Sequence, residues 1–386
     1  MELNTAQNLW EQQVRTQLKT QDIYEQLQTR VEGILIDPIY FEAPIELQRL
    51  PRLEDSSVLV ANYHESLEGE VLAFRLDQNV EGLEEVSVYI QSKELCEHIL
   101  SDNLRVFSLV EVFDPKTQEI STQLGKEFQA KGMERPLCID ISLFQNAGAS
   151  LTQQLLFAVG KAKELIEVFG PDSLDQMLIK VAVGSNYFLE IAKLRALKLL
   201  FHQLGKEYDK EIWPYLYAEP SERNKSTFDE ENNLIRSTLE LSAAMIGGAD
   251  AVFSTDYKLQ ESSDLSKEIS FKQQVILAYE SLINVFEDSM NGSYYVETLT
   301  RKLCEVSWEK FLELEDKGGY LESYSKGEIA KEIYLFATKE HEAFLKGETQ
   351  LIGVNLYPKR DQVKSISELY NEAEIKPVRL SEVFES

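Results

Sequence analysis

From about residue 55 onward, short apolar runs rich in β-branched residues alternate with longer segments of helical periodicity. This alternation is typical of a parallel sheet whose strands are connected by helices. Because eight such runs occur, the pattern predicts an α/β fold, a closed (β/α)8 barrel of the TIM type. The predicted strands cover residues 58–63, 71–76, 86–90, 104–112, 137–142, 177–184, 213–218 and 251–255.

The first three predicted strands stand so close together that little room remains for helices between them. We therefore expect the first half of the barrel to be partly eroded. Later in the chain the helices are better defined. A stripe of apolar positions at helical spacing predicts a core-facing helix after the fifth strand, with Leu151, Leu155, Leu156, Val159, Leu165 and Ile166 on one side.

Residues 219–257 contain one complete barrel repeat. A loop follows the seventh strand, and Thr227 with Glu230 three residues later predicts a capping box that opens a helix. Gly247 can end this helix before the eighth strand begins at Ala251. Barrels of this type carry their chemistry on the loops that follow the strands, so the loop after Glu219 is the expected location of a site.

The two ends of the chain fall outside this pattern. A Gln-rich amphipathic stretch from residue 4 to 30 predicts a helix, and Pro38 favours extended chain after it. Exposed Trp10 and Tyr40 would suit a protein interface. We therefore divide the chain into an N-terminal helix and extended arm at 1–45, the barrel at 46–345 and a C-terminal extension at 346–386.

The formal net charge of −27 disfavours binding to nucleic acid, to anionic membranes and to polyanions such as coenzyme A, unless basic residues gather in one place. Cys96, Cys138 and Cys304 lack metal-ligand spacing, which is typical of reduced thiols in a cytoplasmic protein. Neither a signal peptide nor an apolar run of membrane-spanning length is expected from the sequence.

Several motifs together resemble the methylmalonyl-CoA mutase family, and most closely its small (beta) subunit. Asp-Glu-Glu-Asn-Asn-Leu-Ile-Arg-Ser-Thr is followed by Ile-Gly-Gly-Ala-Asp, and Phe188 opens a Phe-x-Glu-Ile-Ala-Lys-Leu-Arg-Ala helix. Further matches are Gly-Ser-Tyr-x-x-Glu-x-Leu-Thr from Gly292 and Gly-Val-Asn-x-Tyr from Gly353. These motifs occur in the family order, and the resemblance is weak only from residue 41 to 135.

The resemblance implies a reaction that starts by homolysis of adenosylcobalamin. The family binds this cofactor in a separate C-terminal domain, whose Asp-x-His-x-x-Gly motif supplies the lower cobalt ligand. The chain ends at Ser386, before that domain would begin, and the Asp position ahead of His202 is Leu200. His64, His98 and His341 fit no better, so surface or helix histidines are expected and no metal site.

Active relatives hold the thioester with a Tyr-His pair just ahead of the Gln-x-Ala-Gly-Ala segment. The resemblance places Ser142 at the Tyr position and Leu143 at the His position. Leucine can neither donate a hydrogen bond nor transfer a proton, and losing a positioned electrophile costs orders of magnitude in rate. The family's Thr-x-Gln-Asn-Asp strand is missing, and an Arg used near the CoA phosphates falls at Leu199.

Three hypotheses follow. The first is a small, non-catalytic subunit that supports a homologous large subunit carrying the active barrel and adenosylcobalamin. It would bind acyl-CoA weakly or not at all, through vestigial CoA-facing cations at Lys193, Arg195, Lys198 and Arg223. The second is an active acyl-CoA mutase barrel that uses a cobalamin domain on a separate chain. The third is an unrelated barrel enzyme that shares only the fold.

Overall fold

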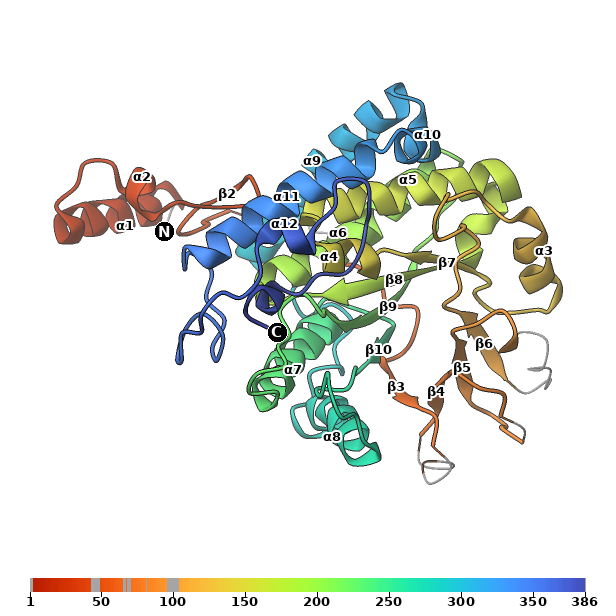
Figure 1. The fold of residues 1–386 in the computed structure, drawn as a ribbon. Coiled ribbons are helices and arrows are strands. Elements are labelled where there is room, and N and C mark those ends of the chain that lie inside the picture. Colours follow the sequence, from red (N-terminus) through yellow and green to blue (C-terminus); the bar gives the residue numbers. More distant parts are fainter. Residues whose placement is uncertain are drawn as a thin grey trace.

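The computed structural model describes residues 3–42, 49–64, 67, 71–80, 82–95 and 104–385 (Figure 1). Cys96 and His98 lie outside the described residues. Eight parallel strands form one sheet in the order β6-β5-β4-β3-β10-β9-β8-β7. Single bridges from Phe107 to Arg135 and from Glu111 to Cys138 connect its two edges, so the sheet is nearly closed into a barrel.

All eight predicted strands are confirmed, although most are shorter than expected. Their bounds are β3 Val58–Asn62, β4 Ala73–Leu76, β5 Ser87–Ile90, β6 Arg105–Ser108, β7 Leu137–Asp140, β8 Met177–Val183, β9 Tyr215–Pro220 and β10 Ala251–Phe253. Side chains alternate between the interior of the barrel and its outer face because the period of a strand is two. Val60 and Tyr89 therefore point inward, whereas Leu59 and Val88 point outward.

Helices cover the outer face of the second half of the barrel. They are α3 Thr122–Ala130, α4 Ser142–Ala147, α5 Leu151–Phe169, α6 Tyr187–Lys206, α7 Glu231–Ile246 and α8 Asp264–Val275. Ser150 and Gln153 form a capping box that opens α5, and the predicted apolar stripe of this helix is buried, as expected. This half holds the largest hydrophobic cluster of the molecule.

The first half of the barrel is eroded, as predicted. The described residues between β3 and β4, and those between β4 and β5, contain no α-helix. The outer faces of these strands contact loops and Phe128 of α3 instead. Within the described residues, helices therefore cover the outer face of β7 to β10, whereas the outer face of β4 and β5 contacts loops and a few side chains of α3 and α8.

Four further helices follow the barrel. They are α9 Tyr294–Asp316, α10 Gly319–Ser325, α11 Glu328–Leu345 and α12 Ile366–Leu369, and a 3-10 turn spans Leu380–Phe384. Helix α9 packs on both α5 and α6, while the segment after α11 folds back over α7 and the loop before it. Within the described ranges, no helix has both the length and the apolar character needed to cross a membrane.

The predicted capping box of α7 is wrong. The helix begins at Glu231, and Thr227 lies in the preceding loop, where its N–H donates to Glu385. Glu230 accepts hydrogen bonds from the N–H groups of Leu259 and Gln260 rather than closing the helix end. Contacts from distant segments thus replaced a local motif. The predicted end is confirmed, because Gly247 caps the helix.

The N-terminal arm is also not a single helix. Helix α1 Leu3–Leu18 ends where Lys19 takes a φ of +54°, and Asp22 caps a short second helix, α2 Ile23–Leu27. A hairpin of β1 Thr29–Val31 and β2 Ile34–Ile36 follows. Figure 1 shows α1 and α2 standing away from the barrel, to which the hairpin is joined.

The aromatic side chains of the arm are less exposed than expected. Trp10 is half-buried, and its ring lies 6.4 Å from Tyr24 and 6.1 Å from Phe41. Tyr40 packs against Tyr295 of α9 at 5.6 Å. Among the described side chains of α1, the large apolar ones that are exposed are Leu9 and Leu18.

Candidate functional site

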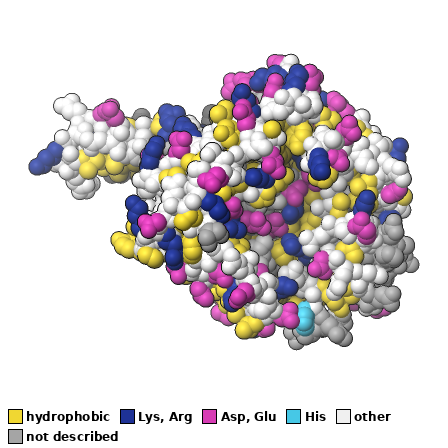
Figure 2. All heavy atoms as spheres, in the orientation of Figure 1, with side chains coloured by type: hydrophobic (Ala, Val, Ile, Leu, Met, Phe, Trp, Pro, Cys, Tyr) yellow, Lys and Arg dark blue, Asp and Glu magenta, His cyan; other side chains and the backbone are white. Residues whose placement is uncertain are grey.

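A chain of charges crosses the carboxyl end of the barrel. Arg75 of β4 lies 3.4 Å from Glu219 of β9, and Lys180 of β8 lies 3.1 Å from both Glu219 and Asp140 of β7. Each residue occupies an inward position of its strand, so the barrel brings together side chains from four strands. Figure 2 shows Asp and Glu side chains, with Lys and Arg beside them, in a hollow near the middle of the face that Figure 1 presents.

These charges stabilise one another. Burial disfavours the charged form of Lys180, but Glu219 and Asp140 raise its pKa above the usual range. Burial likewise opposes ionisation of Asp140, yet Lys180 and the Ser142 hydroxyl hold the pKa of this carboxyl below its usual value. Lys180 and Asp140 are therefore both ionised at neutral pH, and their hydrogen-bonding capacity is directed at the protein itself.

Below this layer, aromatic side chains fill the interior of the barrel. Tyr89 and Tyr215 share a hydrogen bond of 2.7 Å between their hydroxyl groups, and Tyr89 stacks on Phe107 with ring centroids 4.7 Å apart. Tyr217 and Phe253 complete the group, and Arg75 lies 3.9 Å above the ring of Phe253. All five rings are buried. The centre of the barrel is thus a packed core rather than an open passage.

The two positions predicted to replace the catalytic pair lie at the start of α4. Ser142 is buried and donates its hydroxyl proton to Asp140 at 2.5 Å, which ties it to the charge network. Leu143 is half-buried and brings no polar group to the site. Neither residue can supply an acid, a base or an electrophile to a ligand in this arrangement.

The loop after β9, residues 221–228, forms buried hydrogen bonds with the protein. Lys225 lies 2.6 Å from Glu240 of α7, and Ser221 donates to Asn146 of α4. Arg223 contacts Glu340 of α11 at 2.6 Å and donates to the backbone carbonyl of Val378. The loop therefore lies where the sequence placed it, but its polar groups already have partners.

The segment after α11 covers this loop. The Leu380 N–H donates to the carbonyl of Arg223, and the Ser381 hydroxyl donates to the carbonyl of Lys225. Tyr370 joins the two regions, because its hydroxyl accepts from Arg223 at 2.7 Å and lies 2.9 Å from Nδ1 of His341. Burial and the Arg223 cation lower the pKa of His341 to about 4, so this imidazole is neutral.

The basic cluster of α6 is buried as well. Lys193 lies 2.6 Å from Glu190 and donates to the carbonyl of Ala182, while Arg195 forms ion pairs with Asp288 and Glu297. Lys198 donates to the carbonyl of Pro51, and burial lowers its pKa. Contact of these side chains with CoA stays a prediction. In this structure all three, like Arg223, have protein partners.

The described histidines do not fit the role of a lower cobalt ligand. The ring of His202 stacks on Trp213 with centroids 4.2 Å apart, and its Nδ1 lies 3.1 Å from the carbonyl of Ile212. His341 is buried behind Tyr370, and His64 is exposed on the loop after β3. Across the described residues, no group of three or more His, Cys, Asp and Glu side chains is arranged to hold a metal ion.

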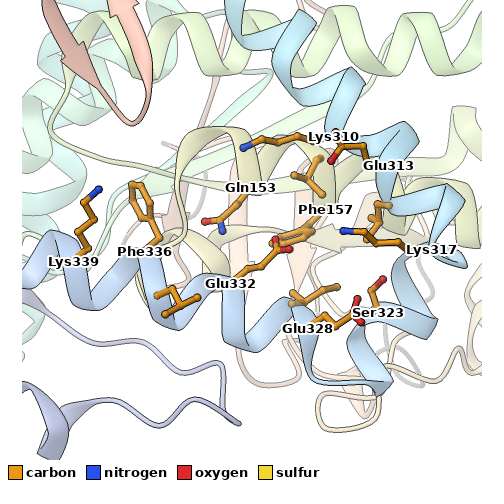
Figure 3. A pocket seen from close by; sticks show the side chains of 14 residues that line it. Gln153, Phe157, Lys310, Glu313, Lys317, Ser323, Glu328, Glu332, Phe336 and Lys339 are labelled. Carbon is orange, nitrogen blue, oxygen red and sulfur yellow. The ribbon is translucent and has the colours of Figure 1, made fainter.

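One groove of about 430 Å³ lies outside the barrel, between α5, α9 and α11 (Figure 3). Its floor contains Leu156 and Phe157, and Lys310, Glu313, Glu332 and Lys339 line its sides. Both signs of charge alternate along it. The groove therefore carries no preference for an anion such as CoA.

Comparison with known proteins extends the agreement seen in the motifs. The family model described as Methylmalonyl-CoA mutase matches residues 92–385, which is well over half of the chain. The chain belongs to the methylmalonyl-CoA mutase family. The match includes α5, α6 and α7, where the family motifs lie, and it also includes the segment that covers the β9 loop.

Three relatives illustrate the range of the family. The methylmalonyl-CoA mutase small subunit of Porphyromonas gingivalis is 32% identical over 59% of this chain and 39% of the relative. The methylmalonyl-CoA mutase of Rhizobium meliloti is 31% identical over 60% of this chain and 34% of the relative. The methylmalonyl-CoA mutase large subunit of Propionibacterium freudenreichii subsp. shermanii is 26% identical over 69% of this chain and 39% of the relative. The chain thus matches less than two fifths of the length of each of these relatives.

The residues of the charge network at the carboxyl end of the barrel were not identified from the sequence. Lys180 interrupts an otherwise apolar strand, Met-Leu-Ile-Lys-Val-Ala-Val, and Arg75 stands in the same way in Ala-Phe-Arg-Leu. A charge at an alternate position of a strand with two buried faces indicates an inward ion pair. This signal could have found the cations, but not their partners.

Proposed function

We propose that the chain is the small, non-catalytic subunit of an adenosylcobalamin-dependent methylmalonyl-CoA mutase, which interconverts methylmalonyl-CoA and succinyl-CoA. A homologous large subunit carries the catalytic barrel and the cofactor, and the two form a heterodimer. The observation that carries this proposal is the filled barrel, in which five buried aromatic rings occupy the interior and Leu143 stands where active relatives carry a histidine.

The reaction in this proposal is taken from the family to which the chain belongs. The partner is taken from the names of two relatives, one a small subunit and the other a large subunit. Adenosylcobalamin supplies the radical chemistry of such a reaction when it is bound. Because His202 and His341 are buried and bonded to protein groups, we assign the cofactor to the partner. No chemical step is assigned to this chain.

We further propose that the chain binds acyl-CoA weakly or not at all. A CoA phosphate would have to displace the carboxylate partners of Lys193, Arg195 and Arg223, and breaking a buried pair leaves an uncompensated charge. We place the complex in the cytoplasm and in propionate metabolism. Cys138 and Cys304 are both free thiols, which agrees with a reducing compartment.

Turnover by the purified chain tests the non-catalytic role. We expect no conversion of methylmalonyl-CoA when adenosylcobalamin is added to the chain alone, and none from a variant with Ser142→Tyr and Leu143→His. Adding the large subunit from the same genome should produce activity and a complex of the summed mass in analytical ultracentrifugation. Turnover by the isolated wild-type chain, or the absence of any complex, would overturn the proposal.

A further inference from the structure

The stretch 276–286, which follows α8, exposes more large apolar side chains than its length would lead one to expect. Tyr279 is 73% exposed and Phe286 is 65% exposed, and the others are Ile276, Leu282 and Val285. We call this stretch the apolar loop. Single exposed apolar residues are ordinary on protein surfaces, but a group of them marks an interaction site.

The backbone of the apolar loop is fixed from below. Arg52 is buried, and its guanidinium donates to the carbonyls of Asn284 at 3.0 Å and Phe286 at 3.1 Å. Asp288, just past the loop, forms an ion pair with Arg195 and accepts from the N–H of Leu50. The exposed side chains therefore project from an ordered support, which reduces the entropy lost when a partner binds.

The conformation of the loop is itself unusual. Residues Ile276–Glu280 form a π-helical turn, and Leu282 has a φ of +54°. A π-helical turn is rare and frequently occurs at functional sites, and a positive φ is uncommon for a large side chain. Folding alone would favour burial of these five side chains, so their outward position indicates a contact with another molecule.

A groove of about 570 Å³ lies beside the apolar loop. Leu59 and Val86 of the barrel wall form one side, and Phe271, Val275 and Tyr279 form the other. In a regular (β/α)8 barrel, each strand is followed by a helix that covers its outer face. The described residues after β3 and after β4 contain no α-helix, so the groove has the place and the lining that a barrel helix would occupy.

The charges near the groove favour a basic partner. Glu85 lines the groove and Glu280 follows Tyr279; both are exposed, and neither makes an ion pair among the described residues. Arg105 also lines the groove, but Glu54 and Glu134 already bind its guanidinium. With a net charge of −27 on the whole chain, a second copy would meet repulsion here.

We infer that the groove and the apolar loop bind a helix of a partner protein, with apolar side chains on one face and Lys or Arg at its flanks. The partner helix covers the part of the barrel wall, beside β3 and β4, where the described residues of this chain contain no α-helix. Under the proposed function, on which this identification rests, the partner is the large mutase subunit. Tyr279 and Phe286 act as the apolar anchors, and Glu280 selects for the basic flank.

Titration of the purified large subunit with variants of the full chain tests this surface. Replacing Tyr279 and Phe286 together by Ser should weaken binding at least about tenfold, because buried aromatic anchors carry much of the affinity of an interface. Glu280→Lys should lower the affinity most at low salt. Leu335→Ser is the control, since Leu335 is also an exposed apolar side chain, at 56%, but lines the groove of Figure 3.

Three outcomes are distinct. A selective loss in the double variant, with the Leu335 control and the melting temperature unchanged, supports the surface. If the double variant binds as tightly as the wild-type chain, the inference is wrong while the proposed function stands. If the wild-type chain does not bind the large subunit at all, the proposed function fails first and the partner assigned here fails with it.

Discussion

The two halves of the barrel bury the same kinds of side chain in different ways. In the half formed by β7 to β10, helices α5, α6 and α7 cover the strands, and cations such as Arg195 and Lys225 are buried with their carboxylate partners. In the half formed by β3 to β6, Arg105 also binds two carboxylates but stays exposed. On the outer face of the barrel, therefore, cations beneath helices are buried with their partners, whereas Arg105 stays open to solvent.

The same contrast applies to apolar side chains. Leu155 and Leu165 of α5 are completely buried, whereas Tyr279 and Phe286 belong to the apolar loop beside the first half of the barrel and are largely exposed. The half with helices is complete within one chain. The other half exposes apolar side chains of the kind found at interfaces. The contacts that attach the two ends of the chain to the complete half include two titratable groups, Glu32 of the N-terminal arm and His341 of α11, which faces Tyr370.

The largest expected effect is a difference in stability between two matched substitutions, one in each half of the barrel. Arg195→Met leaves Asp288 and Glu297 as buried, unpaired carboxylates and should lower the free energy of unfolding by about 3–5 kcal/mol. Arg105→Met also removes a cation from two carboxylates, but solvent screens them, so the loss should stay below about 1 kcal/mol. Urea unfolding of both variants measures this difference, and equal losses would contradict the contrast.

The C-terminal attachment should weaken in acid. The pKa of His341 is about 4 in the folded chain because burial and Arg223 disfavour its charge, while an unfolded histidine titrates near 6.5. The unfolded chain therefore binds more protons, and the free energy of unfolding should fall as the pH decreases from 6.5 to 4, by up to about 3 kcal/mol.

Thermal unfolding of the wild-type chain and of His341→Gln across this pH range isolates the contribution of the imidazole. The difference in stability between the two proteins should change with pH and level off below pH 4. A constant difference would show that His341 is already charged in the folded protein or that it does not hold the C-terminal segment.

The N-terminal attachment should show the opposite pH dependence and weaken as the pH rises. Burial raises the pKa of Glu32 to about 8, and the carboxyl accepts from the N–H of Leu151 at the start of α5. Because the folded state holds this proton more tightly, the contribution of Glu32 is complete below pH 4.5 and is lost as the pH rises through 8. Glu32→Gln keeps the acceptor without the charge.

This variant should be more stable than the wild-type chain at pH 9, by about 1 kcal/mol after allowing for the partial exposure of the side chain. At pH 5 the two should unfold together. Lower stability of Glu32→Gln at pH 9, measured by thermal unfolding, would mean that the helix end stabilises a charged carboxylate instead.

The sequence by itself determined the features that depend on local periodicity. The eight strands, helices α5 and α6, the lack of an α-helix among the described residues between β3 and β5, and the family all follow from patterns within a few tens of residues. The division at residues 45 and 345 stays a prediction. Local patterns suffice for these features because the spacing of apolar side chains and the turns between them are set by neighbours in the chain.

Only the tertiary structure decided which side chains meet. Thr227 looked like a helix cap, but Glu385, far along the chain, binds its N–H group. Lys193 and Arg195, which the resemblance assigned to a vestigial CoA-facing set, are buried in ion pairs. The arm breaks at Lys19 and packs Trp10 on Tyr24. Each outcome depends on contacts between segments distant in sequence, whose free energies exceed the preference of a local motif of about 1 kcal/mol.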